Sequence, residues 1–293
     1  LSPNHCVAVN TDRSQLSKSL ARNKVLLGNG QEHGGEMEEV QAKQDLQLSI
    51  RRVTPFTDAS DFTIVVAGLG GGTGTGAAPL IAQWSRSQIC PVVSVVAIPF
   101  IHERERRYVA LRGLKKMVEA CDCTIVIDNS MESHVPSSKE RRADELASLA
   151  VSGLTDLVSQ MGSIQKQEFR RIVSLGSIAT LCSAPVKSRD MIQSAVFEAL
   201  KSPSARLPLS NTRGAVLLYR GPDAIGNGHA VQAYETLVSL AGHEVDFIYG
   251  SVQRDSDPRI CLLLTGYDYA TAVRTFVEFI ELYDIEYGQT NPG

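Results

Sequence analysis

A glycine-rich segment with two threonines has the residue types that best suit the binding of an anion. Residues 68–76 hold six glycines, with Thr73 and Thr75 between them. Glycine lets the backbone turn sharply and press several amide N–H groups against one anion, and threonine adds hydroxyl donors. The candidate anion-binding residues are Gly70, Gly71, Gly72, Thr73, Gly74, Thr75 and Gly76.

A strand and a helix are expected to position this segment. The apolar, β-branched run 62–67 predicts a buried strand before it, and Leu80, Ile81 and Trp84 have helical spacing after it. Pro79 suits the first turn of that helix, whose positive dipole end would point at the ligand. The pattern predicts a site for a phosphate chain, and a ligand-free linker fits it less well, since linkers do not join a buried strand directly to a helix.

Two commoner phosphate loops do not fit the segment. A Walker A loop needs lysine after its second glycine, and Gly76 is followed by Ala77 and Ala78. A dinucleotide fingerprint needs an acidic residue after the next strand, and the apolar run 92–98 ends at Pro99 without one. An NAD(P)-binding enzyme is therefore disfavoured.

The composition is that of an ordinary soluble globular protein. The 293 residues are 43% hydrophobic and 21% charged, with a net charge of −3, and this length favours two domains. The charge argues against a nucleic-acid partner, since nucleic-acid binders are usually basic. With no apolar run near ~18 residues and no leader, we expect a cytoplasmic location and reduced, buried cysteines.

The heptad 70–76 resembles the signature loop of the tubulin/FtsZ superfamily in its FtsZ form, and the resemblance covers roughly residues 4–268. It implies an α/β fold, with a parallel-sheet, Rossmann-like GTPase domain joined by a long central helix to a smaller α+β domain. The implied divisions are 1–136, 137–162, 163–268 and an extra C-terminal helix and tail, 269–293. The family's first strand and first glycine loop have no counterpart here.

The resemblance also implies the nucleotide and the residues that hold it. The ligand would be GTP or GDP, with any Mg²⁺ held by the phosphates and no metal-ligating side chains. The matching positions are Asn10 after a strand at 6–9, Pro99, Glu103 and Arg107 in a Pro-Phe-x-x-Glu-x-x-x-Arg segment, Asn129 after a strand at 123–127, and Asp144 in the central helix. Turn chemistry explains Asn129 equally well, and a solvated charge near a helix start remains an alternative for Asp144.

In this family a loop after the central helix supplies the acid that activates water in the neighbouring subunit. The matching segment is 162–168, with Gln165 at the first acidic position and Glu168 at the second. A neutral glutamine cannot act as a general base, although it could orient water, and Glu168 could still accept the proton. We therefore expect slow hydrolysis or none.

The function implied is a GTP-binding protein that forms head-to-tail filaments with itself or a related FtsZ, reaching a membrane only through an adaptor. The alternative is a non-hydrolysing regulator or copolymerisation partner of a true FtsZ. Elsewhere, periodicity predicts several elements and leaves 169–173 open as helix or strand. The predicted helices are 36–50, 137–161, 191–200, 230–240 and 269–283, and the predicted strands are 91–98, 214–219, 245–249 and 260–265.

Overall fold

The computed structural model describes residues 6–28, 37–57, 62–87, 92–131, 139–254 and 258–287. It divides into two compact units, 1–124 and 125–293, each described here by itself. Both combine helices with strands, and the parallel pairs β1–β2, β3–β4 and β7–β8 make the fold α/β, as expected. The four-part division inferred from the resemblance stays a prediction.

The first unit begins with a two-stranded parallel sheet. Strand β1 (Val7–Asn10) pairs with β2 (Asn23–Leu26), and the short helix α1 (Arg13–Lys18) connects them. The long helix α2 (Met37–Thr57) places Ala42, Leu46 and Val53 in one buried cluster with Val25 and Leu27. Ala77, from the turn after the glycine-rich segment, joins this cluster, so the cluster supports that turn.

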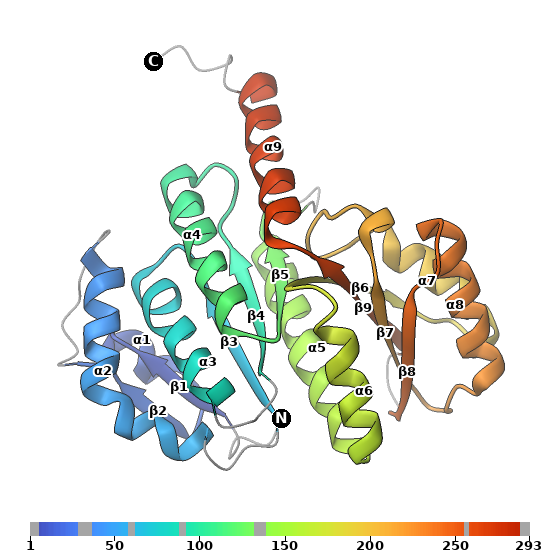
Figure 1. Ribbon diagram of the computed structural model, residues 1–293, viewed down its shortest axis with the longest axis horizontal. Helices are drawn as coiled ribbons and strands as arrows, with labels where there is room; N and C mark the ends of the chain where they lie inside the picture. Colours follow the sequence, from blue (N-terminus) through green and yellow to red (C-terminus); the bar gives the residue numbers. More distant parts are fainter. Residues whose placement is uncertain are drawn as a thin grey trace. The chain divides into compact units, whose positions relative to one another are not determined.

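A second parallel pair carries the glycine-rich segment. Strand β3 (Thr63–Gly68) pairs with β4 (Val92–Ile98) in parallel. Helices α3 (Ala78–Ser87) and α4 (Arg104–Ala120) lie side by side against these strands (Figure 1). Almost all of β4 is buried, because its apolar side chains are covered on both faces.

The second unit is built on four strands in the order β6, β9, β7, β8. Strand β9 is antiparallel to β6 and β7, whereas β8 is parallel to β7. Helices α7 and α8 cover one face of this sheet, and α5 and α6 lie against the other (Figure 1). The bounds are α5 (Lys139–Gln160), α6 (Ser163–Val173), β6 (Ile178–Pro185), α7 (Ile192–Leu200), β7 (Gly214–Gly221), α8 (Asn227–Ala241), β8 (Asp246–Gln253), β9 (Arg259–Tyr267) and α9 (Tyr269–Tyr287). Strand β5 (Cys123–Asp128) spans the division between the units.

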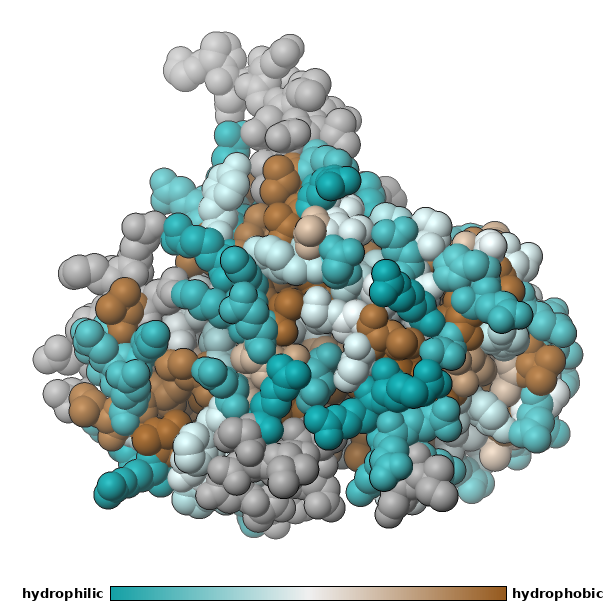
Figure 2. All heavy atoms as spheres, viewed as in Figure 1, coloured by the Kyte–Doolittle hydropathy of each residue, from teal (hydrophilic) through white to brown (hydrophobic). Residues whose placement is uncertain are grey.

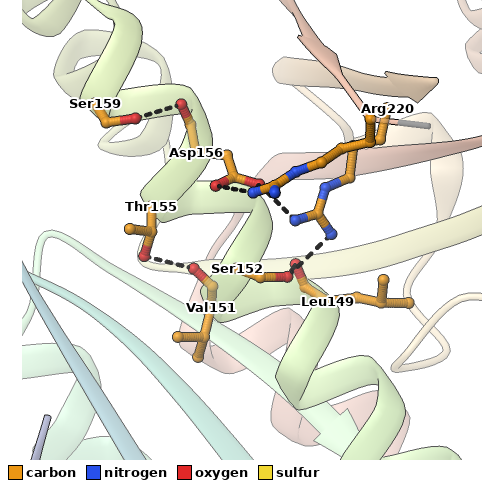
Figure 3. Close-up of polar contacts among 8 residues, drawn as sticks. Leu149, Val151, Ser152, Thr155, Asp156, Ser159 and Arg220 are labelled. Carbon is orange, nitrogen blue, oxygen red and sulfur yellow. Dashed lines mark hydrogen bonds and ion pairs between the residues drawn. The ribbon is translucent and has the colours of Figure 1, made fainter. Parts of the chain in front are cut away.

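Two arginines fix α5 to the end of this sheet, and Figure 3 shows the first of them, Arg220, beside Ser152 and Asp156. Arg220, at the end of β7, donates to the Ser152 hydroxyl at 3.0 Å and to the Asp156 carboxylate. Arg254 contacts the same carboxylate at 3.2 Å from the chain just after β8. The Arg220 and Asp156 side chains are only 16% and 19% exposed, so this ion pair is far less screened by solvent than a surface pair.

Most predicted elements are confirmed, with two corrections. The helix predicted at 36–50 continues to Thr57 and contains Pro55, because Val53 and Thr57 are buried on its inner face. The segment 162–168, predicted as a loop, begins α6 at Ser163. Strand β6 was not identified from the sequence. The first two residues of the helix predicted at 137–161 lie outside the described residues.

Of the five cysteines in the described residues, four are buried, as predicted, whereas Cys6 is only partly buried. Cys90 lies outside the described residues. Burial raises the pKa of the Cys121 thiol to about 11 and that of Cys182 to about 12, so both are protonated near neutrality. Cys123 and Cys261 are buried as well. In the described ranges, no helix is long and apolar enough to cross a membrane.

We predict that Gly214→Ala destabilises the second unit and that Gly228→Ala does not. A Cβ at Gly214 would lie 2.6 Å from Thr265 Oγ1 and 2.7 Å from Leu175 Cδ1, whereas one at Gly228 would meet nothing within 4 Å. Overpacking of this kind costs about 1–3 kcal/mol, while alanine in a helix is usually neutral or favourable. Urea unfolding followed by circular dichroism measures both, and equal midpoints for the two variants would contradict the packing described here.

Candidate functional site

The glycine-rich segment folds back tightly against β3 and the start of α4. Gly70 has a φ of +93°, and a Cβ there would lie 2.7 Å from the Arg106 carbonyl oxygen and 2.8 Å from Pro99 Cγ. A Cβ on Gly74 would lie only 1.9 Å from the Gly68 carbonyl oxygen. These positions require glycine, because no side chain fits between the backbones.

The segment then becomes helical without a break. Residues Thr73–Ala77 form a π-helical turn that runs into α3. Among the described residues, a Cβ built on Gly71 would meet nothing within 4 Å, so the backbone just before this turn borders open space there. Amide groups at the start of a helix, next to open space, suit a phosphate group.

The two threonine hydroxyls have different partners. Thr75 is fully buried and accepts a hydrogen bond from the Gly70 N–H at 2.9 Å. This hydrogen bond holds the two ends of the loop 70–75 together. The Thr73 hydroxyl donates to Asn10 Oδ1 at 3.1 Å and lies 2.9 Å from the Thr11 hydroxyl. Thr73 therefore joins the segment to the end of β1, and it brings the predicted residue Asn10 beside the loop.

The predicted site residues around α4 form hydrogen bonds and ion pairs within the first unit. The Pro99 ring lies beside Gly70, with its Cγ 2.8 Å from where a Cβ on that glycine would be. The Pro99 carbonyl oxygen accepts a hydrogen bond from Arg107 Nη1 at 2.6 Å. Arg107 is completely buried, and its guanidinium holds the Pro99 backbone in place through this hydrogen bond. Glu103 accepts the Phe100 N–H at 3.1 Å and pairs with Arg106. Direct contact of these side chains with a nucleotide stays a prediction.

Asn129 and Asp144 belong to the second unit. Asn129 follows β5, and its Oδ1 atom is buried without a hydrogen-bond partner among the described residues. A buried acceptor in this state costs about 1–3 kcal/mol, so the atom suits a donor from a ligand. Asp144 lies exposed near the start of α5. A carboxylate can accept two parallel N–H groups, such as those of guanine.

The two predicted catalytic residues lie in the first two turns of α6. Gln165 turns back, and its Oε1 accepts the Gly162 N–H at 2.8 Å as a helix cap. Glu168 is half exposed and lies 3.4 Å from Arg171, which also donates to Asp246 at 2.8 Å. The hydrogen bond that Arg171 donates to the Asp246 carboxylate raises the pKa of Arg171, so the guanidinium stays charged beside Glu168.

Sequence reasoning missed two residues of these arrangements. Thr11 completes the link to Thr73, and its place in the segment Asn10-Thr11-Asp12 was the available signal. Arg171 follows Glu168 by three residues on a helix, a spacing that predicts an ion pair once the segment is known to be helical. Over the described ranges, no group of three or more histidine, cysteine, aspartate or glutamate residues could hold a metal ion.

Comparison with known proteins gives a consistent result. Residues 2–133 match the family model described as the tubulin/FtsZ family, GTPase domain. The cell division protein FtsZ of Methanothermobacter thermautotrophicus is 33% identical over 253 residues, covering 82% of this chain and 65% of the relative. FtsZ 1 of Pyrococcus horikoshii is 31% identical over 277 residues, covering 89% of this chain and 73% of the relative. The chain thus spans about two thirds of the first of these relatives.

Solved structures show the same fold. An FtsZ dimer of M. jannaschii has a TM-score of 0.79 at 27% identity, over 89% of this chain and 80% of that one. The GTPγS-bound protofilament of CetZ2 from Haloferax volcanii has a TM-score of 0.74 at 23% identity, over 96% and 89%, and supports the fold alone. From the glycine-rich loop, the α/β fold and these relatives together, the chain belongs to the tubulin/FtsZ family.

Proposed function

We propose that this chain binds GTP or GDP and assembles head-to-tail into filaments that hydrolyse GTP slowly. The observation that carries the proposal is the hydrogen-bonded link from Thr73 to Asn10 and Thr11 beside the open space at Gly71. This arrangement places hydroxyl groups and backbone amides at one point, which suits the phosphate chain of a nucleotide. Any Mg²⁺ would be held by the phosphates and water.

For the base, the proposed residues are Asp144 and Asn129, which the resemblance to the family assigns to this role. Asp144 offers a carboxylate to the guanine N–H groups, and Asn129 Oδ1 is a buried acceptor for a base or ribose donor. An adenine base presents a different donor pattern to the same carboxylate, so Asp144 is the proposed source of guanine preference.

Assembly and hydrolysis are proposed by analogy with the relatives. The similar solved structures include an FtsZ dimer of M. jannaschii. Glu168 is half exposed on α6 and can reach a neighbouring molecule as a general base. Gln165 stands at a position where the family has an acid, and its side chain caps its own helix. Glu168 is therefore the one carboxylate of this segment left to act as the general base.

The alternative function is a regulator or copolymerisation partner that does not hydrolyse GTP. Two observations favour it: Gln165 is used as a cap, and Glu168 already has a cationic partner in Arg171. Nucleotide content after purification and sedimentation with GTP separate these possibilities. A chain that carries no guanine nucleotide and does not pellet with GTP contradicts the filament proposal, and one that pellets without phosphate release supports the alternative.

We predict that Thr73→Val weakens GTP binding about tenfold to a hundredfold, whereas Thr73→Ser keeps it. Valine preserves the volume but removes the hydroxyl that joins Asn10 and Thr11, and such bonds contribute about 1–3 kcal/mol when a charged ligand depends on them. Isothermal titration with GTP measures the affinity. Equal affinities for the valine and serine variants would show that the hydroxyl has no role.

For Asp144, substitution by asparagine should reduce the preference for GTP over ATP by about tenfold or more, since the amide replaces one acceptor by a donor. Competition between the two nucleotides at equal concentration gives this ratio. The exposed neighbour Glu145 on the same helix supplies the matched control, Glu145→Gln, which should leave the ratio unchanged. A ratio that falls equally in both variants would reject Asp144 as the base-reading residue.

Glu168→Gln should lower phosphate release about a hundredfold or more while sparing assembly, because the variant keeps the shape but loses the base. Glu198→Gln is the control, since Glu198 also forms an exposed ion pair with a residue three positions on. A phosphate-release assay on pelleted filaments measures both. If the Glu198 variant loses as much activity as the Glu168 variant, or neither loses any, Glu168 is not the base.

A further inference from the structure

Three charged side chains of the second unit are linked through one guanidinium. Arg171 donates from Nη1 to Asp246 Oδ2 at 2.8 Å and from Nη2 to Glu168 Oε1 at 3.4 Å. Arg171 and Glu168 lie one turn apart on α6, whereas Asp246 begins β8. All three are about half exposed, and Figure 2 shows hydrophilic side chains over α6, in the lower part of the view.

The two carboxylates hold Arg171 unequally. The contact with Asp246 has the length of a charge-assisted hydrogen bond, whereas the contact with Glu168 is longer and weaker. The hydrogen bond to Asp246 is also the main reason that the pKa of Arg171 is raised, and Glu168 contributes less. Asp246 is therefore the stronger partner of the guanidinium.

Because one guanidinium serves both carboxylates, Asp246 and Glu168 compete for it. The group is planar and rigid, so a shift toward one carboxylate draws it away from the other. Each carboxylate also offsets part of the positive charge that attracts the other. Removing the charge of Asp246 should therefore tighten the pair between Arg171 and Glu168. Removing Arg171 should leave Glu168 without an ion pair in the described part of the chain.

We propose that the ion pair with Arg171 is an autoinhibitory contact that restrains Glu168, and that Asp246 limits the restraint by competing for Arg171. This inference rests on the proposed function, in which Glu168 is the general base. A base must turn a carboxylate oxygen toward the attacking water, whereas the ion pair keeps the carboxylate on its own helix. Since exposed ion pairs are weak, breaking this one should change the rate about twofold to fivefold.

Phosphate release from pelleted filaments tests the proposal through two variants with opposite expected effects. Arg171→Gln should raise the rate about twofold to fivefold, because Glu168 loses its partner. Asp246→Asn should lower the rate about twofold, because the guanidinium is then left to Glu168. The double variant should match Arg171→Gln, because Asp246 acts only through Arg171. A purely structural link between α6 and β8 would instead make both single variants change in the same direction.

A second measurement needs no nucleotide. A carbodiimide with glycine ethyl ester modifies accessible carboxylates, and mass spectrometry gives the rate at Glu168. This rate should be highest in Arg171→Gln, intermediate in the unsubstituted chain and lowest in Asp246→Asn. Lys201→Gln is the matched control, since Lys201 forms an exposed ion pair with Glu198 at the same helical spacing. It should raise the rate at Glu198 and leave both the rate at Glu168 and phosphate release unchanged.

The outcomes separate this inference from the proposed function. Equal modification of Glu168 in the unsubstituted chain and in Arg171→Gln would overturn the restraint. Single variants whose phosphate release shifts in the same direction would also overturn it, provided that circular dichroism shows both to be folded. If the modification rates follow the expected order but no variant releases phosphate, the proposed hydrolysis fails while the competition for Arg171 is supported.

Discussion

The close approach of the backbone at Gly74 to that at Gly68 determines the geometry of the candidate site. With a Cβ only 1.9 Å from a carbonyl oxygen, any other residue at Gly74 would push the loop away from β3. The displaced loop would carry the Thr73 hydroxyl away from Asn10, and the link between β3 and β1 would break. The same tight turn places the first amides of the helical segment beside the open space at Gly71. This one steric constraint therefore determines the position of the Thr73 hydroxyl, the positions of the first amide groups and the direction of the helix.

The glycine-rich loop could be predicted from the sequence because the features that determine it are local. Glycine content, β-branched residues before it and helical spacing after it act within about twenty residues, so strand, turn and helix could be predicted. The π-helical form of Thr73–Ala77 was not predictable, since it depends on Thr75 reaching back to Gly70 and on Ala77 packing under α2. Arg107 is a similar case. The family resemblance places Arg107 among the nucleotide-binding residues, and the sequence does not reveal that tertiary packing buries its guanidinium against the Pro99 carbonyl.

Strands β3 and β4 show the limit of composition as a guide to burial. Both are short, apolar and β-branched, and they pair in parallel with each other. Yet β4 is buried almost throughout, while Val66 in β3 is 56% exposed. In the described residues β3 pairs with β4 on one side only, and it is the neighbours of a strand that decide how much of it is covered. Apolar composition predicts that a segment is a strand, but not which of its residues reach solvent.

The start of α6 shows how one substitution can change both structure and chemistry. A glutamine side chain has a carbonyl oxygen, and in Gln165 that oxygen is occupied by the Gly162 N–H. Only the amide N–H groups remain to contact water, and these donate rather than accept. Gln165 can therefore orient a water molecule through its amide N–H groups but cannot take its proton. Glu168 keeps accepting oxygens, although Arg171, itself fixed by Asp246, lies beside them. Any proton transfer from water at this helix thus depends on one carboxylate, and that carboxylate already has an ion-pair partner in Arg171. This engagement is the physical reason to expect slow turnover, and it arises from contacts three and seventy-five residues apart that the loop pattern alone does not reveal.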